Sequence, residues 1–191
     1  MRSARGVGAA ILVLSGLSAG ARGAPMVTQP FVTPQHDVDV VYAMLPDEAG
    51  GGADATQRLR WSVALQAQRI DVPGAPTYVV TRHREHLTAA IRLDGRGVIE
   101  QAAPEAVPAP GQAASGGYTR LAGPAQDIAG RSCSEWQVND ASGQSTVLCL
   151  TDDGVMLRVR QGGRVLLLAR SVSEATQPEA LFVIPKTAAA P

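Results

Sequence analysis

Residues 57–68, QRLRWSVALQAQ, alternate between apolar and polar side chains along their whole length. A repeat of two residues is that of a half-buried β-strand, whereas an amphipathic helix repeats every 3.6 residues. The apolar set comprises Leu59, Trp61, Val63, Leu65 and Ala67. The stretch is therefore predicted to be one long strand that buries a single face, and a chain built around it is expected to form a sheet.

Shorter runs with strand-forming composition fill much of the remaining chain. They cover residues 36–44, 77–82, 86–93, 97–101, 132–138, 145–150, 155–160 and 164–172. Twenty glycines and thirteen prolines separate them, which favours many turns over long helices. We predict a mainly β fold, a single curved antiparallel sheet resembling half of a barrel, with a β-sandwich as the alternative.

Cys133 and Cys149 are the only cysteines in the chain. Their separation is too wide for a C-x-x-C redox pair, and neither has the neighbouring ligands of a zinc site. Folding the segment as a hairpin about Ala141 places the two cysteines directly opposite each other. They are predicted to form a cross-strand disulfide, a bridge worth about 3 kcal/mol for a loop of this size.

The N-terminus has the three-part layout of a secretory signal peptide. Arg2 and Arg5 precede an apolar run over residues 6–17, and small residues follow. We predict a signal peptide at 1–21, with the cut as late as residue 23, and a periplasmic or secreted mature protein without a transmembrane segment. A retained N-terminal membrane anchor is the alternative, although the run is shorter than the roughly 20 residues that span a bilayer.

The mature chain is predicted to form a single β domain over residues 26–185, followed by a disordered tail at 186–191. Residues 102–117 are rich in alanine, proline and glycine and contain almost no large apolar side chain. Such a composition does not order itself, so we predict a mobile loop. A linker between two small domains is the alternative.

Composition and motifs argue against several functional classes. Seventeen basic and 17 acidic residues balance, and only 4% of residues are aromatic, so nothing favours nucleic-acid binding. In the stretch RHREH, His83 and His86 fall on opposite faces of a strand and indicate a solvated turn rather than a metal site. No nucleophile elbow or phosphate-binding loop is present. We predict no catalytic residue, no metal and no cofactor, and hence a protein that is not an enzyme.

The last strands are predicted to be apolar on one face and half apolar on the other. With two-residue turns, Met156, Val165, Leu167 and Ala169 share the second face with the two cysteines, beside arginines 158 and 160. A three-residue turn with a bulge at Gly154 would shift this register. The second face is expected to line a binding site for an apolar ligand or to contact a partner. The alternative is that both faces of the sheet are buried in the core of a sandwich.

Three short patterns carry a resemblance to a known family. They are C-x-x-W, C-L-T-D-D-G-V-x-L-R and P-x-x-L-F-x-I-P, in this order within residues 118–185. Together they resemble uncharacterised exported proteins of the lipoprotein-carrier superfamily, the LolA/LolB-like half-barrels. The resemblance implies a strongly curved antiparallel sheet wrapped around helical segments and an apolar cavity. This chain departs from that pattern because it has no convincing amphipathic helix, and no functional residue carries over.

Three functional hypotheses follow. The first is a non-enzymatic envelope protein that binds an apolar small molecule or a lipidated partner on its curved sheet. The second is a structural or protein-interaction module of the envelope. The third is a hydrolase without a recognisable motif.

Overall fold

A computed structural model describes residues 29–45, 55–103, 107–140 and 142–186. The predicted signal peptide and residues 187–191 of the predicted tail lie outside these ranges. The described chain is mainly β, as predicted. Its strands are β1 Val38–Met44, β2 Ala55–Ser62, β3 Ala67–Asp71, β4 Thr77–Arg82, β5 Leu87–Arg92, β6 Val98–Ala102, β7 Thr119–Arg120, β8 Gln126–Ile128, β9 Arg131–Asn139, β10 Ser145–Leu150, β11 Met156–Gln161 and β12 Arg164–Ser173.

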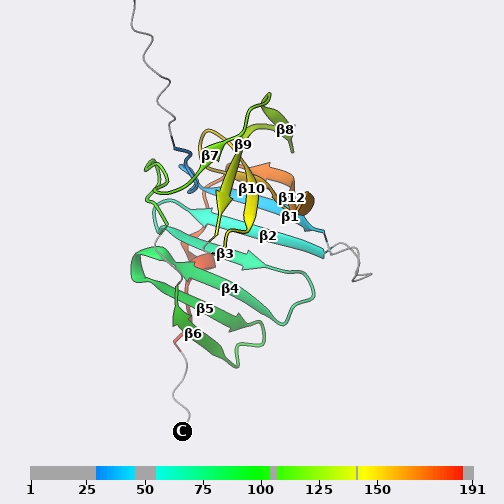
Figure 1. Cartoon of the computed structure of the whole chain (residues 1–191). Helices are drawn as coiled ribbons and strands as arrows, with labels where there is room; N and C mark the ends of the chain where they lie inside the picture. Colours follow the sequence, from blue (N-terminus) through cyan, green and yellow to red (C-terminus); the bar gives the residue numbers. More distant parts are fainter. Residues whose placement is uncertain (1–28, 46–54, 104–106, 141, 187–191) are drawn as a thin grey trace, which may run out of the picture.

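The strands form a single antiparallel sheet that does not close into a barrel, which confirms the predicted fold class. Their order is β6-β5-β4-β3-β2-β1-β12-β11-β10-β9-β7. The short strand β8 lies outside this order and pairs only with β9 among the described strands. The first and last long strands, β1 and β12, therefore meet in the middle of the sheet. Figure 1 shows that the sheet curls, so that β9 and β10 cross in front of β1 and β2.

The prediction of one long strand over residues 57–68 is wrong in one respect, because two strands and a turn occupy the stretch. β2 ends at Ser62, and a turn closed by the Gln66 amide donating to the Val63 carbonyl (3.2 Å) leads into β3. Gln66 takes the left-handed conformation that the turn requires, with φ 46°. Alternation persists through the turn because Val63 and Leu65 each pack against a hydrophobic core.

The predicted disulfide is confirmed between β9 and β10, with a Cα–Cα distance of 5.4 Å. The predicted hairpin register is wrong by two residues. Cys149 lies opposite Glu135, and Asn139 lies opposite Ser145. The bridge is therefore diagonal, and because the shift is even, both cysteines remain on one face.

Two β-bulges overturn the prediction that Met156, Val165, Leu167 and Ala169 share a face. One lies in the β10–β11 ladder and pairs Leu150 with Met156. The other lies between β11 and β12 and leaves Leu166 unpaired. A bulge inserts one residue and so inverts the alternation beyond it, which no period-two pattern records.

The register assigns these four residues to the two faces of the curved sheet. Val165 pairs with Arg160 on the convex face, which also carries the cysteines and Arg158. Leu167 pairs with Val159, and Ala169 pairs with Tyr42, both on the concave face. Met156 is also concave. The expected second face is thus divided between two surfaces.

Two hydrophobic cores stabilise the sheet. The first lies mainly on the concave face of β1, β2 and β10–β12 and contains Val38, Val40, Tyr42, Trp61, Cys133, Cys149, Val155, Leu157 and Ala169. The second lies on the convex face of β3–β5 and contains Ala67, Val80, Ala89, Ile91 and Phe182. Phe182 belongs to the short 3-10 helix η2, Glu179–Phe182, in the red C-terminal segment that passes behind β3 in Figure 1.

Helical structure is sparse within the described ranges. Besides η2 there is one 3-10 turn, η1, His83–Glu85, between β4 and β5. None of the described helices has the length and apolar character that crossing a membrane requires.

Candidate functional site

The concave face encloses a cavity of about 160 Å³ where the sheet curls over itself. Side chains from β1, β2 and β3 form one wall, and side chains from β10, β11 and the turn between them form the opposite wall. The strands and the β10–β11 turn contribute Val38, Val40, Tyr42, Leu59, Trp61, Gln68, Leu148, Leu150, Val155 and Met156. Residues more than a hundred positions apart in the sequence thus face each other across this space.

Two irregular segments cover the cavity where the LolA/LolB-like resemblance implied helices. Val32, Thr33 and Pro34 line it from the N-terminal side, and Val107 lines it from the segment after β6. The Thr33 hydroxyl donates to the Pro108 carbonyl at 2.7 Å, which joins the two segments. This hydrogen bond holds the described part of the alanine- and proline-rich loop against the N-terminal segment that covers the cavity. The mobility of the loop stays a prediction.

Gly154 makes the close approach of the cover possible. It lies in the β10–β11 turn with φ +88°, and a Cβ there would lie 2.4 Å from the Thr33 carbonyl oxygen. In the same turn, the Asp153 carbonyl accepts a hydrogen bond from the Gln35 amide at 3.0 Å. Glycine is required because it tolerates the left-handed backbone and leaves room for another chain segment.

Polar groups are few in the lining of the cavity. The Tyr42 hydroxyl donates to the Met156 carbonyl at 2.7 Å and joins the two walls. Burial raises the pKa of that hydroxyl, so it stays protonated. The rings of Trp61 and His83 lie with their centroids 5.5 Å apart. Burial, with a smaller contribution from the charge of His86, lowers the pKa of His83 and favours its neutral form.

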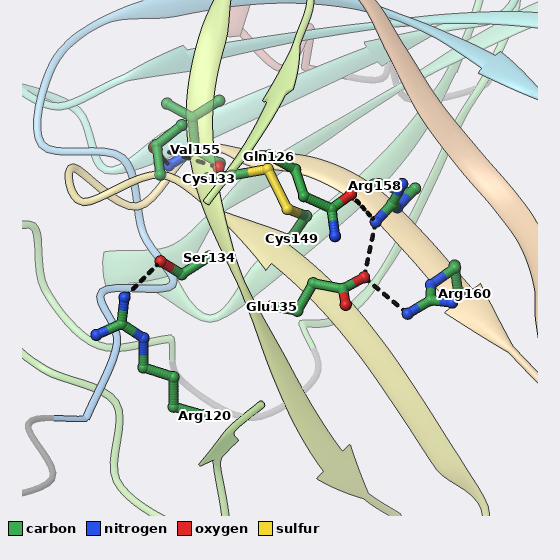
Figure 2. Close-up of a disulfide and its surroundings, with 10 residues drawn as sticks. Arg120, Gln126, Cys133, Ser134, Glu135, Cys149, Val155, Arg158 and Arg160 are labelled. Carbon is green, nitrogen blue, oxygen red and sulfur yellow. Dashed lines mark hydrogen bonds and ion pairs between the residues drawn. A yellow bond between two sulfur atoms is a disulfide. The ribbon is translucent and has the colours of Figure 1, made fainter. Parts of the chain in front are cut away.

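The convex face beside the disulfide has a different character. One Glu135 carboxylate oxygen accepts from Arg158 and from Arg160, both at 2.7 Å (Figure 2). Gln126 on β8 accepts a further bond from Arg158. The two arginines are two residues apart on β11 and share a face, so the carboxylate between them relieves their mutual repulsion.

A third group of polar side chains lies at the edge of the N-terminal segment. His36, Asp153 and Glu174 each offer a potential metal ligand, all within 4.8 Å of one another. Arg131 donates to both carboxylates, at 3.0 Å to Asp153. Because the guanidinium pairs with both carboxylates, and the Nε2 of His36 lies 3.1 Å from Asp153, the group is accounted for as a cluster of ion pairs and hydrogen bonds.

Sequence reasoning located only part of the cavity. Of the four residues predicted for an apolar face, Met156 lines it, Leu167 and Ala169 lie on the same concave surface outside it, and Val165 is on the convex face. Their role toward a ligand stays a prediction. The contributions of Leu59, Trp61 and His83 were missed. Alternation did place Leu59 and Trp61 on one face, but nothing in the sequence said which strands would lie across from them.

Comparisons with known proteins bear on the fold. No protein-family model and no curated protein matches the sequence. Among solved structures, an uncharacterized conserved protein from Thermus thermophilus superposes with a TM-score of 0.55 at 12% identity, covering 80% of this chain and 87% of that one. These values define a shared fold.

Two structures of MucB share the fold as well. MucB in complex with MucA(peri) matches with a TM-score of 0.51 at 16% identity over 82% of this chain. The MucA/MucB complex of Pseudomonas aeruginosa matches with a TM-score of 0.52 at 15% identity over 81%. In both cases this chain spans 57% of the MucB chain. The matches are consistent with the half-barrel that the sequence resemblance implied.

Proposed function

We propose that this protein is a non-catalytic protein of the cell envelope that binds an apolar group, from a small molecule or a lipidated partner, in the cavity of its half-barrel. The cavity on the concave face is the observation that carries this proposal. Its walls are mostly aliphatic and aromatic, with a few polar groups, which is the usual composition of a ligand pocket. Among the described residues that line it, none is Asp, Glu, Lys or Arg.

The absence of a catalytic role is part of the proposal. His83 is the one histidine in the described lining, and neither a carboxylate nor a cysteine accompanies it there. General acid–base or nucleophilic catalysis uses such a partner to activate or orient the reacting group. A pocket of this kind is suited to binding.

The disulfide supports a location in the periplasm or outside the cell, since such bonds persist in oxidising compartments. We expect mass spectrometry of the protein from an envelope fraction to show a first residue of Arg22 or Ala24. An intact Met1 in that fraction would contradict export with cleavage.

Native mass spectrometry of protein isolated from its own cells tests the binding proposal. The wild type is expected to carry a noncovalent apolar compound or partner. Leu59→Trp should lose it, because the indole fills the cavity, whereas Leu93→Trp should keep it, because Leu93 is 64% exposed outside the cavity. Wild-type protein without any such passenger, indistinguishable from Leu59→Trp, would refute the proposal.

A protein-interaction module is the second candidate, and the two MucB structures favour it because they contain MucA. In this chain, β6 is an edge strand, and Ile99 on it is 73% exposed. An exposed edge offers unpaired backbone groups to a partner strand. A photo-crosslinker at position 99 would then trap an envelope protein, while one at Leu93, outside the strand, would not. Equal trapping at both positions would argue against this candidate.

A further inference from the structure

We infer that the cavity is specific for an uncharged, ring-sized group that bears a hydrogen-bond acceptor, and that Trp61 supplies the donor. This inference rests on the proposed function and narrows it to a class of ligand. Three properties of the cavity support it: an unpaired polar corner, an uncharged lining and a small volume.

The polar corner consists of Trp61 and His83. Trp61 is 3% exposed, and its Nε1 has no hydrogen-bond partner among the residues that the structure describes. Within the same residues, the Nδ1 of His83 is likewise buried and unpaired. A buried polar atom without a partner has lost its hydration without compensation, so most such atoms are paired in native proteins. Both side chains line the cavity. A ligand seated there, carrying an acceptor toward Trp61, compensates for that loss.

The lining argues against a charged ligand. No Asp, Glu, Lys or Arg contributes to the described cavity wall, and burial lowers the pKa of His83, which favours its neutral form. A carboxylate or ammonium group buried here would lose its hydration without gaining a counter-charge. The acceptor is therefore a carbonyl, ether or hydroxyl oxygen. Neutral His83 adds one further donor or acceptor, according to its tautomer.

The volume sets the size of the ligand. At about 160 Å³ the cavity lies below the roughly 300–1,000 Å³ of pockets for drug-sized ligands. It is close to an engineered apolar cavity of about 150 Å³ that takes up benzene. One ring with a short substituent fits this space, and a full-length acyl chain does not, so the inference takes the small-molecule form of the proposed function.

Two neutral probes of nearly equal shape test the inference on the full mature protein with its disulfide intact. Acetophenone carries a carbonyl acceptor, and α-methylstyrene replaces that oxygen with a methylene group. Acetophenone is expected to bind about fivefold more tightly, the gain from one neutral hydrogen bond. Benzoate, which adds a charge, is expected not to bind.

Variants assign the donor. Trp61→Phe keeps an aromatic ring and removes the N–H, so it should abolish the preference for acetophenone. Trp136→Phe, at a tryptophan outside the cavity, should keep that preference. Should Trp61→Phe fail to fold, the wild type still decides the question. The chain has two tryptophans, and only the indole N–H resonance that belongs to Trp61 should shift when acetophenone is added.

The outcomes separate the inference from the proposed function. If both neutral probes bind equally, the polar corner is not the recognition element. If the preference survives Trp61→Phe, Trp61 is not the donor. Either result overturns the inference, while apolar binding stands. If neither probe binds and neither indole resonance moves, the inference and the small-molecule form of the proposed function both fail.

Discussion

The two halves of the sheet bury opposite faces. In the half built from β1, β2 and β9–β12, the core lies mainly on the concave side, where the sheet curls around the cavity. In the half built from β3–β6, the core lies on the convex side, beneath η2. The change occurs between β2 and β3, where Trp61 pairs with Gln68 on the concave face and Ala67 faces the other way.

The difference follows from what covers each half. The curled half folds over its own concave face, and its outer strands are joined by the disulfide. The flatter half has no described strand opposite it, so the C-terminal segment supplies the apolar cover, inserting Phe182 against Val80, Ala89 and Ile91. An open sheet can thus bury either face, depending on where a neighbouring segment lies. The cavity of the proposed function lies in the curled half.

The largest expected effect comes from removing the cover of the flatter half. Phe182→Ala should lower the free energy of unfolding of β3–β5 by about 3–5 kcal/mol, the usual cost of truncating a buried phenylalanine. Hydrogen exchange should show faster amide exchange in these strands than in β9–β11. Val183→Ala, at a neighbour that is 54% exposed, is the control and should change little. Equal loss of protection in both halves would show that they unfold as one unit.

The curled half should respond to loss of its disulfide. Replacing both Cys133 and Cys149 with Ser is expected to lower the free energy of unfolding by about 3 kcal/mol, because the open chain gains entropy when unfolded. Urea titration measures the change, and exchange should accelerate mainly in β9 and β10. Thiol titration of the native wild type should find no free thiol; two reactive thiols would exclude the bridge.

A smaller effect is expected on the convex face of the curled half. Glu135→Gln leaves Arg158 and Arg160 without their shared carboxylate and should cost about 1–2 kcal/mol, reduced by partial exposure. Added salt should narrow the difference from wild type because it screens the repulsion between the arginines. Glu179→Gln, at an exposed residue of η2, is the control. A cost that does not depend on salt would point to lost contacts rather than to charge.

The smallest effect concerns His83, which contacts Trp61 near the boundary between the halves. Its pKa in the folded protein lies below the ordinary value of 6.5, so the unfolded chain binds the proton more readily. The contribution of His83 to stability is therefore complete above pH 6.5 and decreases as the pH falls below it. Thermal melts between pH 7.5 and 5 should show this decrease, and His83→Gln should remove it.

His86→Gln is the matched control for that pH series. It should retain most of the pH dependence, because burial is the larger cause of the shift at His83 and the charge of His86 is the smaller one. If the wild type and His83→Gln lose stability in parallel on acidification, another group is responsible.

Local chemistry in the sequence was sufficient to predict the strands and the disulfide. Alternation, turn residues and β-branched runs predicted β1, β4, β5, β6 and the last four long strands within a few residues. These features depend on contacts between near neighbours along the chain. The two short strands β7 and β8 were not predicted, since two or three residues carry no measurable periodicity.

Only the tertiary structure decided which strands face each other and which face each half buries. The turn at residues 63–66 keeps the alternation of a strand because its apolar side chains reach two different cores. The bulges at Leu157 and Leu166 move Met156 and Leu167 to the concave face and leave Val165 outside. The cavity arises because the sheet curls until Leu148 lies across from Leu59. The sequence by itself determined a mainly β chain with one bridge, because pattern and composition encode local conformation. The position of the cavity depends on curvature and on covering segments, which arise from contacts between residues far apart in the chain.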